Sequence, residues 1–167
     1  AGAATDLPSC APLDPAPCPG SGARGRGGGA QECHVGVLGE RGERLAAVAA
    51  MVYLVFNEGY TTNVAEHGAK APLCEEAIRL CRLLLQLFAN EPEVMGLAAL
   101  VLLQHARAAS RFDADGAVVL LEDQERTKWD QSMVAEGLAL VDKALRHHRP
   151  GPYQVQAAIA ALNERSR

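Results

Sequence analysis

The sequence predicts an all-α domain of about five helices in stacked helical hairpins, preceded by a Gly/Pro-rich tail. Three observations lead to this fold class. Apolar residues recur every three or four positions over most of the chain after residue 43, which is the period of an amphipathic helix. Proline and glycine breaks separate these segments. The segments also repeat at a fixed offset, as they do in helical solenoids.

The first 39 residues differ in composition from the rest of the chain. They contain nine of the sixteen glycines and five of the nine prolines, whereas all seven aromatic residues lie beyond residue 52. Such a segment buries too little apolar surface to offset its conformational entropy. We therefore expect a disordered tail over residues 1–39 and one folded domain over residues 40–167.

The first helix is expected to begin near Glu43, because Leu45, Val48, Val52 and Val55 step by three and four. Further apolar residues extend this stripe almost around the helix, which predicts a central and buried position. Gly59 is suited to the left-handed conformation of a helix C-cap. The helix should therefore end at residues 57–60.

A polar loop through Lys70 and then Pro72 precede the second expected helix, at about residues 74–88. Its outer face should carry an ion pair between Glu75 and Arg79, four positions apart. Pro92 then starts a third helix over about residues 92–110, since proline is favoured in a first turn. Within that helix, Gly96 is expected to permit close helix packing.

The residues 113–116, Asp-Ala-Asp-Gly, predict a turn. The β-branched run that follows, 118–121, is expected to be extended at most. A fourth helix should span about residues 128–147, with Asp123 or Thr127 as its N-cap and an ion pair between Arg126 and Asp130. A fifth, at 153–165, has its apolar stripe at Val155, Ile159 and Leu162.

An internal repeat is the main organisational feature of the chain. At an offset of sixty residues, Glu76-Ala77-Ile78 falls on Glu136-Gly137-Leu138, and Pro92 falls on Pro152. Each copy consists of a helix, a short proline-containing break and a second helix. The sequence therefore predicts two similar helical hairpins that stack on one another.

Composition narrows the possible functions. A net charge of −4 and a pI near 5.7 argue against nucleic-acid binding, and the basic residues 146–149 sit where a helix end favours cations. No apolar run reaches the roughly 20 residues of a membrane span, and no signal peptide is recognisable. The five cysteines form no zinc pattern, even with His34 beside Cys33, and Cys74 and Cys81 are expected to be buried thiols in a reducing compartment. We expect a cytoplasmic protein.

Two segments are candidates for chemical sites. Residues 111–122 fit a calcium-binding loop at Asp113, Asp115 and Glu122, but Arg111 occupies the first position, where a carboxylate is required. Residues 122–130 could supply an acid/base pair of carboxylates with Trp129 as a binding platform. Carboxylates so close in sequence more often form a solvated face. Cys81 and His105 could approach each other, but a buried cysteine is usually inert. We therefore predict no catalytic, cofactor-binding or metal-binding residues.

The same segments resemble a known family. The runs 43–48 and 52–60, ending in Phe-Asn-Glu-Gly-Tyr, are similar to the start of a C-terminal extension in one group of extracytoplasmic-function sigma factors. The similarity continues through 76–80, 91–94, 96–97, 115–116 and 121–126. It also covers Trp129-Asp130, Gly151-Pro152-Tyr153-Gln154 and 156–161. It spans about residues 43–162, and the Phe-Asn-Glu-Gly-Tyr and Gly-Pro-Tyr motifs are the most specific.

The resemblance implies a tetratricopeptide-like helical extension that regulates a sigma factor through protein contacts, with the sigma-2 and sigma-4 domains or core RNA polymerase as partners. No sigma-2 or sigma-4 pattern precedes residue 43, so promoter recognition is not expected from this chain alone. The resemblance assigns the motif residues to packing or to a contact surface without deciding between them. These residues are Asn57, Glu58, Gly59, Tyr60, Arg79, Asp123, Gln124, Arg126, Trp129, Asp130, Gly151, Pro152 and Tyr153.

Two alternatives remain at the level of the sequence. The chain could be a free-standing helical repeat whose groove binds a peptide from a separate partner. It could also be a small helical enzyme that uses Glu58, Glu122 or Asp123.

Overall fold

The computed structural model describes residues 32–61 and 64–165, with side chains from residue 39 to 61 and from 72 onward. The described chain forms five α-helices: α1 (Glu32–Tyr60), α2 (Val64–Leu87), α3 (Pro92–His105), α4 (Gln131–Leu145) and α5 (Pro152–Arg165). Three short 3-10 turns, at Ala108–Ser110, Leu121–Asp123 and Arg126–Lys128, lie between α3 and α4. The described part contains one isolated β-bridge, between Phe112 and Val118, and no named strand. The predicted all-α class is confirmed.

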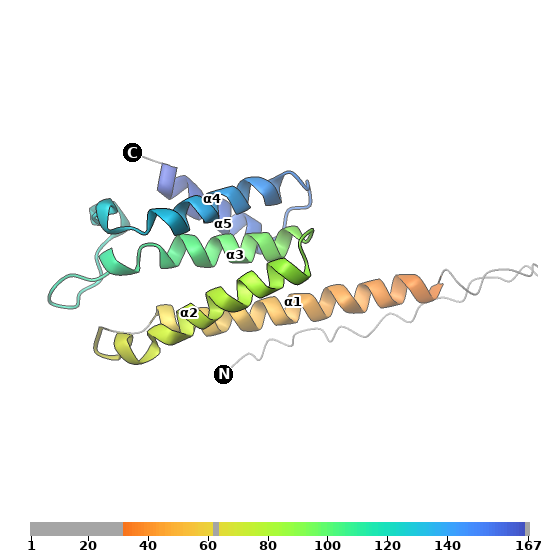
Figure 1. Ribbon diagram of the computed structural model, residues 1–167, viewed down its shortest axis with the longest axis horizontal. Helices are drawn as coiled ribbons and strands as arrows, with labels where there is room; N and C mark the ends of the chain where they lie inside the picture. Colours follow the sequence, from red (N-terminus) through yellow and green to blue (C-terminus); the bar gives the residue numbers. More distant parts are fainter. Residues whose placement is uncertain (1–31, 62–63, 166–167) are drawn as a thin grey trace, which may run out of the picture.

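The helices stack in layers around α3 (Figure 1). The pair α1–α2 lies on one side of α3 and the pair α4–α5 on the other, while the N-terminal part of α1 extends beyond the bundle. None of the described helices is both long enough and apolar enough to cross a membrane.

The buried centre is α3, not α1 as the sequence predicted. Every residue from Val94 to Leu103 is at most 1% exposed, or buried in the case of Gly96, whereas Met51 and Leu54 of α1 are 66% and 65% exposed. Both helices carry apolar residues on most faces, so the periodicity of the sequence does not show which of them is central. The packing of the helices shows that it is α3, because α3 has neighbours on both sides.

Glycine lets neighbouring helices approach α3 closely. A Cβ built at Gly96 would lie 2.6 Å from the backbone nitrogen of Gln154 in α5. A Cβ at Gly137 of α4 would lie 2.8 Å from Cγ of Leu103. The predicted role of Gly96 in close packing is therefore confirmed. Gly137 likewise permits the close approach of α4 to α3.

The first two helices are longer than predicted. The helix α1 begins at Glu32, so the predicted boundary at residue 39 falls inside it, and residues 1–31 lie outside the described part. Gly59 is a buried residue within α1 and has no positive φ, so the predicted C-cap is wrong. The helix α2 begins at Val64, which places Pro72 inside a helix. A proline there removes one backbone donor, and local sequence rules count this against a helix.

Two local predictions, about an ion pair and a helix cap, are also corrected. Arg79 pairs with Glu76 at 2.7 Å instead of with Glu75. Asp130, not Asp123 or Thr127, caps α4.

The predicted apolar stripe of α5 faces outward. Val155, Ile159 and Leu162 are 52%, 57% and 65% exposed, and the buried positions are Gln154, Ala157 and Ala161. The small side chains of Ala157 and Ala161 suit the close approach of α5 to α3, which Gly96 and Gln154 show.

The repeat seen in the sequence corresponds to two helical hairpins, α2–α3 and α4–α5. Pro92 and Pro152, which coincide at the offset of sixty, are the first residues of α3 and α5. The hairpins are joined by an ion pair between Arg82 of α2 and Glu136 of α4 at 2.7 Å, in addition to the buried packing around α3.

Candidate functional site

The Asn57–Tyr60 motif connects the end of α1 to the loop that follows α3, through contacts between Tyr60 and Arg111. The Arg111 guanidinium lies over the Tyr60 ring, 3.8 Å from its centroid, and its Nη1 donates a hydrogen bond to the Tyr60 carbonyl. Tyr60 also stacks on Phe56, with ring centroids 5.3 Å apart. Arg111, the residue that is incompatible with a calcium loop, is therefore a packing residue in its own right.

Within this motif, packing and surface roles fall to different residues. Gly59 is buried and Asn57 is half-buried, and the Asn57 carbonyl accepts hydrogen bonds from the backbone nitrogen and Oγ1 of Thr61 at 2.9 and 2.7 Å. Glu58 is exposed. Only Glu58 of the four presents its side chain mainly to solvent.

The second motif region, residues 121–130, is organised around a buried tryptophan. Trp129 is only 5% exposed, and its Nε1 donates a hydrogen bond to Oγ of Ser110 at 2.8 Å. Gln124 joins this group, because its Nε2 donates to the Val119 carbonyl at 3.1 Å and its Oε1 accepts from the Ser110 hydroxyl at 3.4 Å. The Arg126 guanidinium covers the Trp129 ring at 5.0 Å.

Asp130 is the N-cap of α4. Its Oδ1 accepts hydrogen bonds from the backbone nitrogens of Ser132 and Met133 at 2.9 and 3.1 Å, and from the Ser132 hydroxyl at 2.6 Å. The Ser132 hydroxyl and the Met133 N–H hold the pKa of Asp130 below its ordinary value. Its own backbone nitrogen donates to the Ala106 carbonyl at 2.9 Å, which ties α4 to the end of α3.

This geometry does not favour the acid/base hypothesis for residues 122–130. Glu122, Asp123 and Glu125 are exposed, and Trp129 is too buried to serve as a platform for a ligand. Glu125 instead pairs with Lys128 at 2.7 Å, and this hydrogen bond lowers its pKa. The segment acts as a structured connection between α3 and α4.

The calcium-like segment forms a closed turn. Oδ1 of Asp113 accepts hydrogen bonds from the backbone nitrogens of Asp115 and Ala117 at 3.0 and 2.8 Å, and Gly116 has a φ of 83°. Across the part of the chain described, no group of three or more His, Cys, Asp and Glu side chains is placed to hold a metal ion. The side chains of Cys33 and His34 lie outside the described residues.

The two cysteines of α2 are buried thiols, as predicted. Cys74 and Cys81 are each 2% exposed, and neither forms a disulfide bond. Burial raises the pKa of the Cys81 thiol to about 12. A nucleophile must be present as the thiolate, so a Cys81–His105 catalytic pair gains no support.

The Gly-Pro-Tyr motif docks the start of α5 on Glu93 of α3. The Glu93 carboxylate accepts hydrogen bonds from the backbone nitrogens of Tyr153 and Gln154 at 3.1 and 3.2 Å, and from Nε2 of Gln154 at 3.0 Å. A Cβ built at Gly151 would overlap the carboxyl group of Glu93. Gly151 and Tyr153 are therefore packing residues at a helix–helix junction.

One buried ion pair was not anticipated from the sequence. Nε of Arg107 lies 3.7 Å from Oε1 of Glu164, and the Glu164 side chain is only 2% exposed. Desolvation raises the pKa of Glu164, although the Arg107 charge opposes this shift. Nothing in the local pattern of α5 distinguishes Glu164 from a solvent-exposed glutamate, so only the tertiary structure shows this pair.

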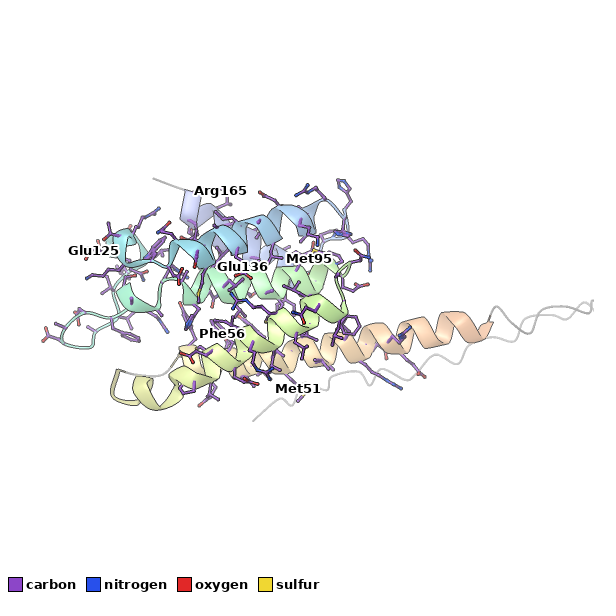
Figure 2. The ribbon with its side chains drawn as sticks, in the orientation of Figure 1. Met51, Phe56, Met95, Glu125, Glu136 and Arg165 are labelled. Atoms are coloured by element: carbon purple, nitrogen blue, oxygen red, sulfur yellow. The ribbon has the colours of Figure 1, made fainter. Side chains whose placement is uncertain are left out.

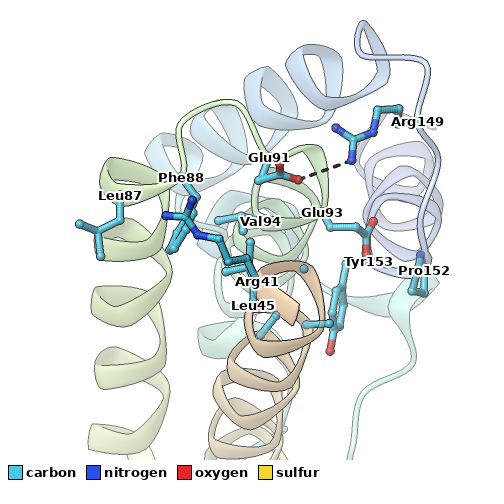
Figure 3. A pocket seen from close by; sticks show the side chains of 13 residues that line it. Arg41, Leu45, Leu87, Phe88, Glu91, Glu93, Val94, Arg149, Pro152 and Tyr153 are labelled. Carbon is cyan, nitrogen blue, oxygen red and sulfur yellow. Dashed lines mark hydrogen bonds and ion pairs between the residues drawn. The ribbon is translucent and has the colours of Figure 1, made fainter. Parts of the chain in front are cut away.

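An open groove lies at one end of the bundle, where α1 meets the α2–α3 and α4–α5 turns. It has a volume of 790 Å³, and its lining is mostly apolar with charged side chains at the edge. Figure 3 shows Leu45 of α1 and Val94 of α3 in this groove, with Arg149 and Glu91 joined by an ion pair of 3.8 Å above it.

The outer face of α1 is an exposed apolar stripe. Its members are Ala47, Ala50, Met51 and Leu54, which share one side of the helix because they are spaced by three, one and three residues. Figure 2 shows Met51 at the edge of the molecule that faces away from α3. We call this surface the α1 stripe.

Comparison with known proteins places this architecture in a family. A family of unknown function, DUF6596, matches residues 44–145, which cover α2, α3, α4 and most of α1. An uncharacterized protein of Rhizobium meliloti (strain 1021) is 66% identical over 127 residues, which are 76% of this chain and 30% of that protein. The chain therefore spans less than a third of this relative's length. No solved structure is significantly similar to the chain. Because the family match covers more than half of the sequence, this chain belongs to the DUF6596 family.

Proposed function

We propose that this chain is a non-enzymatic regulatory domain of an extracytoplasmic-function RNA polymerase sigma factor. It would act in transcription initiation, in the cytoplasm, by contacting the sigma-2 and sigma-4 domains or core RNA polymerase. The motifs at residues 56–60 and 151–153 supply the family resemblance. The relative of more than three times the matched length supports a role as one part of a longer polypeptide.

The observation that carries an interaction role is the α1 stripe. Met51 and Leu54 are 66% and 65% exposed on a helix whose opposite face is buried. Apolar patches of this kind on a protein surface mark interaction sites. Most motif residues, by contrast, take part in contacts within the domain. The contact surface for a partner therefore need not coincide with the motifs.

Binding of the purified chain to defined partners tests this proposal. Core RNA polymerase and a sigma-2/sigma-4 fragment from a sigma factor of this group are the two analytes, measured by biolayer interferometry. Replacing Met51 and Leu54 by Glu should weaken binding by about tenfold or more, since burying such side chains contributes about 1.5–3 kcal/mol each. Ile159→Glu changes an equally apolar and 57% exposed residue in α5, in another layer of the bundle; it is the matched control and should bind normally.

Two results would count against the proposal. One is the failure of the wild-type chain to bind either analyte. The other is sequence-specific retardation of promoter DNA by the chain alone, because the acidic domain is not expected to recognise DNA.

A peptide-binding role is the second candidate, and the 790 Å³ groove is the observation that favours it. Apolar lining with a charged edge suits an amphipathic helix or an extended apolar peptide. Peptides selected from a random library for binding should lose affinity for Phe88→Glu, which alters the groove, and keep it for the α1 stripe variant. Peptides insensitive to Phe88→Glu would exclude the groove.

A further inference from the structure

The apolar stripe of α5 faces outward. Val155, Ile159 and Leu162 are 52%, 57% and 65% exposed, and their spacing of four and three residues places them on one side of the helix. We call this surface the α5 stripe. The helix α5 belongs to a different layer of the bundle from α1 (Figure 1), and the two helices meet where the Tyr53 and Tyr153 rings pack edge to face, with centroids 5.5 Å apart.

The internal repeat assigns a role to this surface. At the offset of sixty residues, the α5 stripe corresponds to Met95, Ala99 and Leu102 of α3, which are 0%, 0% and 1% exposed. Of these three, Ala99 is covered by the hairpin that follows α3, since it packs in one cluster with Val141 of α4 and Ala157 of α5. Leu102 packs mainly in the cluster of α1 and α2, with Met133 and Leu140 of α4 at its edge. Ile159 is thus at the position where, one repeat earlier, the next hairpin packs.

A terminal repeat of a helical solenoid normally has a polar outer face, which keeps the protein soluble. The exposed side of α5 instead carries three large apolar side chains, as the covered face of an internal repeat would. We infer that the α5 stripe is the stacking surface for a further helical hairpin of the same polypeptide in the longer members of the family. This inference goes beyond the proposed role in transcription and does not depend on it.

Two observations favour a tethered hairpin over a second copy of the chain. The stripe consists of three side chains, whereas a stable interface between free proteins usually involves about 20–30 residues on each side. A hairpin in the same polypeptide needs less surface, because its effective concentration is high. In addition, the matched region is only 30% of the rhizobial relative, so most of that protein is available to supply the hairpin.

Cysteine labelling tests the inference in intact proteins. The variants are Ile159→Cys in this chain and a cysteine at the aligned position of the full-length rhizobial relative. Ala114→Cys, in the exposed turn at 113–117, and its aligned counterpart are the controls. Labelling by a bulky maleimide is followed by peptide mass, which separates these sites from the native cysteines.

In this chain, the thiols introduced by Ile159→Cys and by Ala114→Cys should react at similar rates. In the full-length relative, the cysteine aligned with residue 159 should react about tenfold more slowly than its control, or slower still, since labelling would require the hairpin to open. If this substitution prevents folding, as judged by circular dichroism, the position aligned with Val155 at the edge of the stripe replaces it.

Equal rates at the two positions of the full-length relative would overturn the inference. Labelling of the Ile159→Cys variant of this chain that slows as the protein concentration rises would also overturn it, because the occupant would then be a second copy. Neither result bears on polymerase binding by the α1 stripe, so the two proposals fail independently.

Discussion

The carboxylate of Glu93 in α3 accepts a hydrogen bond from the backbone nitrogen of Tyr153 in α5 at 3.1 Å. Each residue lies in the first turn of its helix, and the two occupy corresponding positions of the sixty-residue repeat. One carboxylate therefore lies near the N-terminal ends of two helices, where the helix dipole favours negative charge. This junction explains why a short Gly-Pro-Tyr motif begins the last helix, with Gly151 just before its first residue.

Gly151→Ala is expected to destabilise the fold. The new methyl group would overlap the Glu93 carboxyl group and disturb the hydrogen bonds to Tyr153 and Gln154. Forcing extra atoms into a packed site typically costs about 1–3 kcal/mol. Urea unfolding followed by circular dichroism measures the change in unfolding free energy.

Gly42→Ala is the matched control for this prediction. Gly42 lies within α1, and an added Cβ meets no atom within 4 Å. Alanine is a better helix former than glycine by about 1 kcal/mol, so this variant should be more stable than the wild type. Equal effects of the two substitutions would contradict the proposed close contact at Gly151.

Arg111→Ala is expected to lower the unfolding free energy by about 2 kcal/mol, because it removes a cation–π contact and a charged hydrogen bond. Both interactions join the loop after α3 to Tyr60 at the end of α1. Thermal unfolding provides the measurement. Arg79→Ala, which breaks an exposed pair with Glu76, should change stability very little. A loss at Arg79 as large as that at Arg111 would argue against this assignment.

Asp130→Asn should make the protein less sensitive to acid. The folded state lowers the pKa of Asp130, so ionised Asp130 stabilises the fold above the unfolded pKa of about 3.9. This contribution is lost as the pH falls through the lower folded-state pKa. The stability difference between wild type and variant should therefore be constant at neutral pH and shrink below about pH 4.

Chemical denaturation at several pH values from neutral to acidic measures this difference. Asp130→Ala, which removes the cap of α4 altogether, should be less stable than Asp130→Asn at every pH, because asparagine also accepts the N-cap hydrogen bond. A difference between wild type and Asp130→Asn that grew on acidification would show that the sign is wrong.

Glu164→Gln should also weaken the pH dependence of stability, but the contribution that it removes has the opposite sign to that of Asp130. Desolvation raises the folded-state pKa of Glu164, so above the unfolded pKa of about 4.3 the folded protein retains a proton that the unfolded chain has lost. Stability therefore falls as the pH rises through this window, up to the folded-state pKa. The variant, which does not titrate, should lack this fall.

Glu122→Gln controls for the removal of any carboxylate, since Glu122 is exposed. The pH profile of its stability is the reference with which that of Glu164→Gln is compared. If Glu164→Gln also followed that profile, the burial of the Arg107–Glu164 pair would not affect ionisation in solution.

The sequence by itself determined the helical class, the order of the helices and the repeat. Apolar residues at helical spacing and the prolines at 92 and 152 suffice for this, because they act within a few residues of chain. The role of Gly96 could also be anticipated, since a glycine inside a helix is costly without a packing reason. Helix ends were less predictable: Gly59 and Pro72 carry the usual signals for an end, and both lie within helices.

Only the tertiary structure decided which helix is central and which apolar face is covered. The periodicity of α5 indicates a face at Val155, Ile159 and Leu162, yet the bundle buries the alanine face and leaves that stripe exposed. The pairing of Glu164 with Arg107 was equally hidden, because its partner lies in a distant part of the sequence and desolvation depends on all the surrounding atoms. The spacing of apolar residues along a helix indicates that one face is apolar. Which neighbour covers that face depends on the space that the surrounding helices leave.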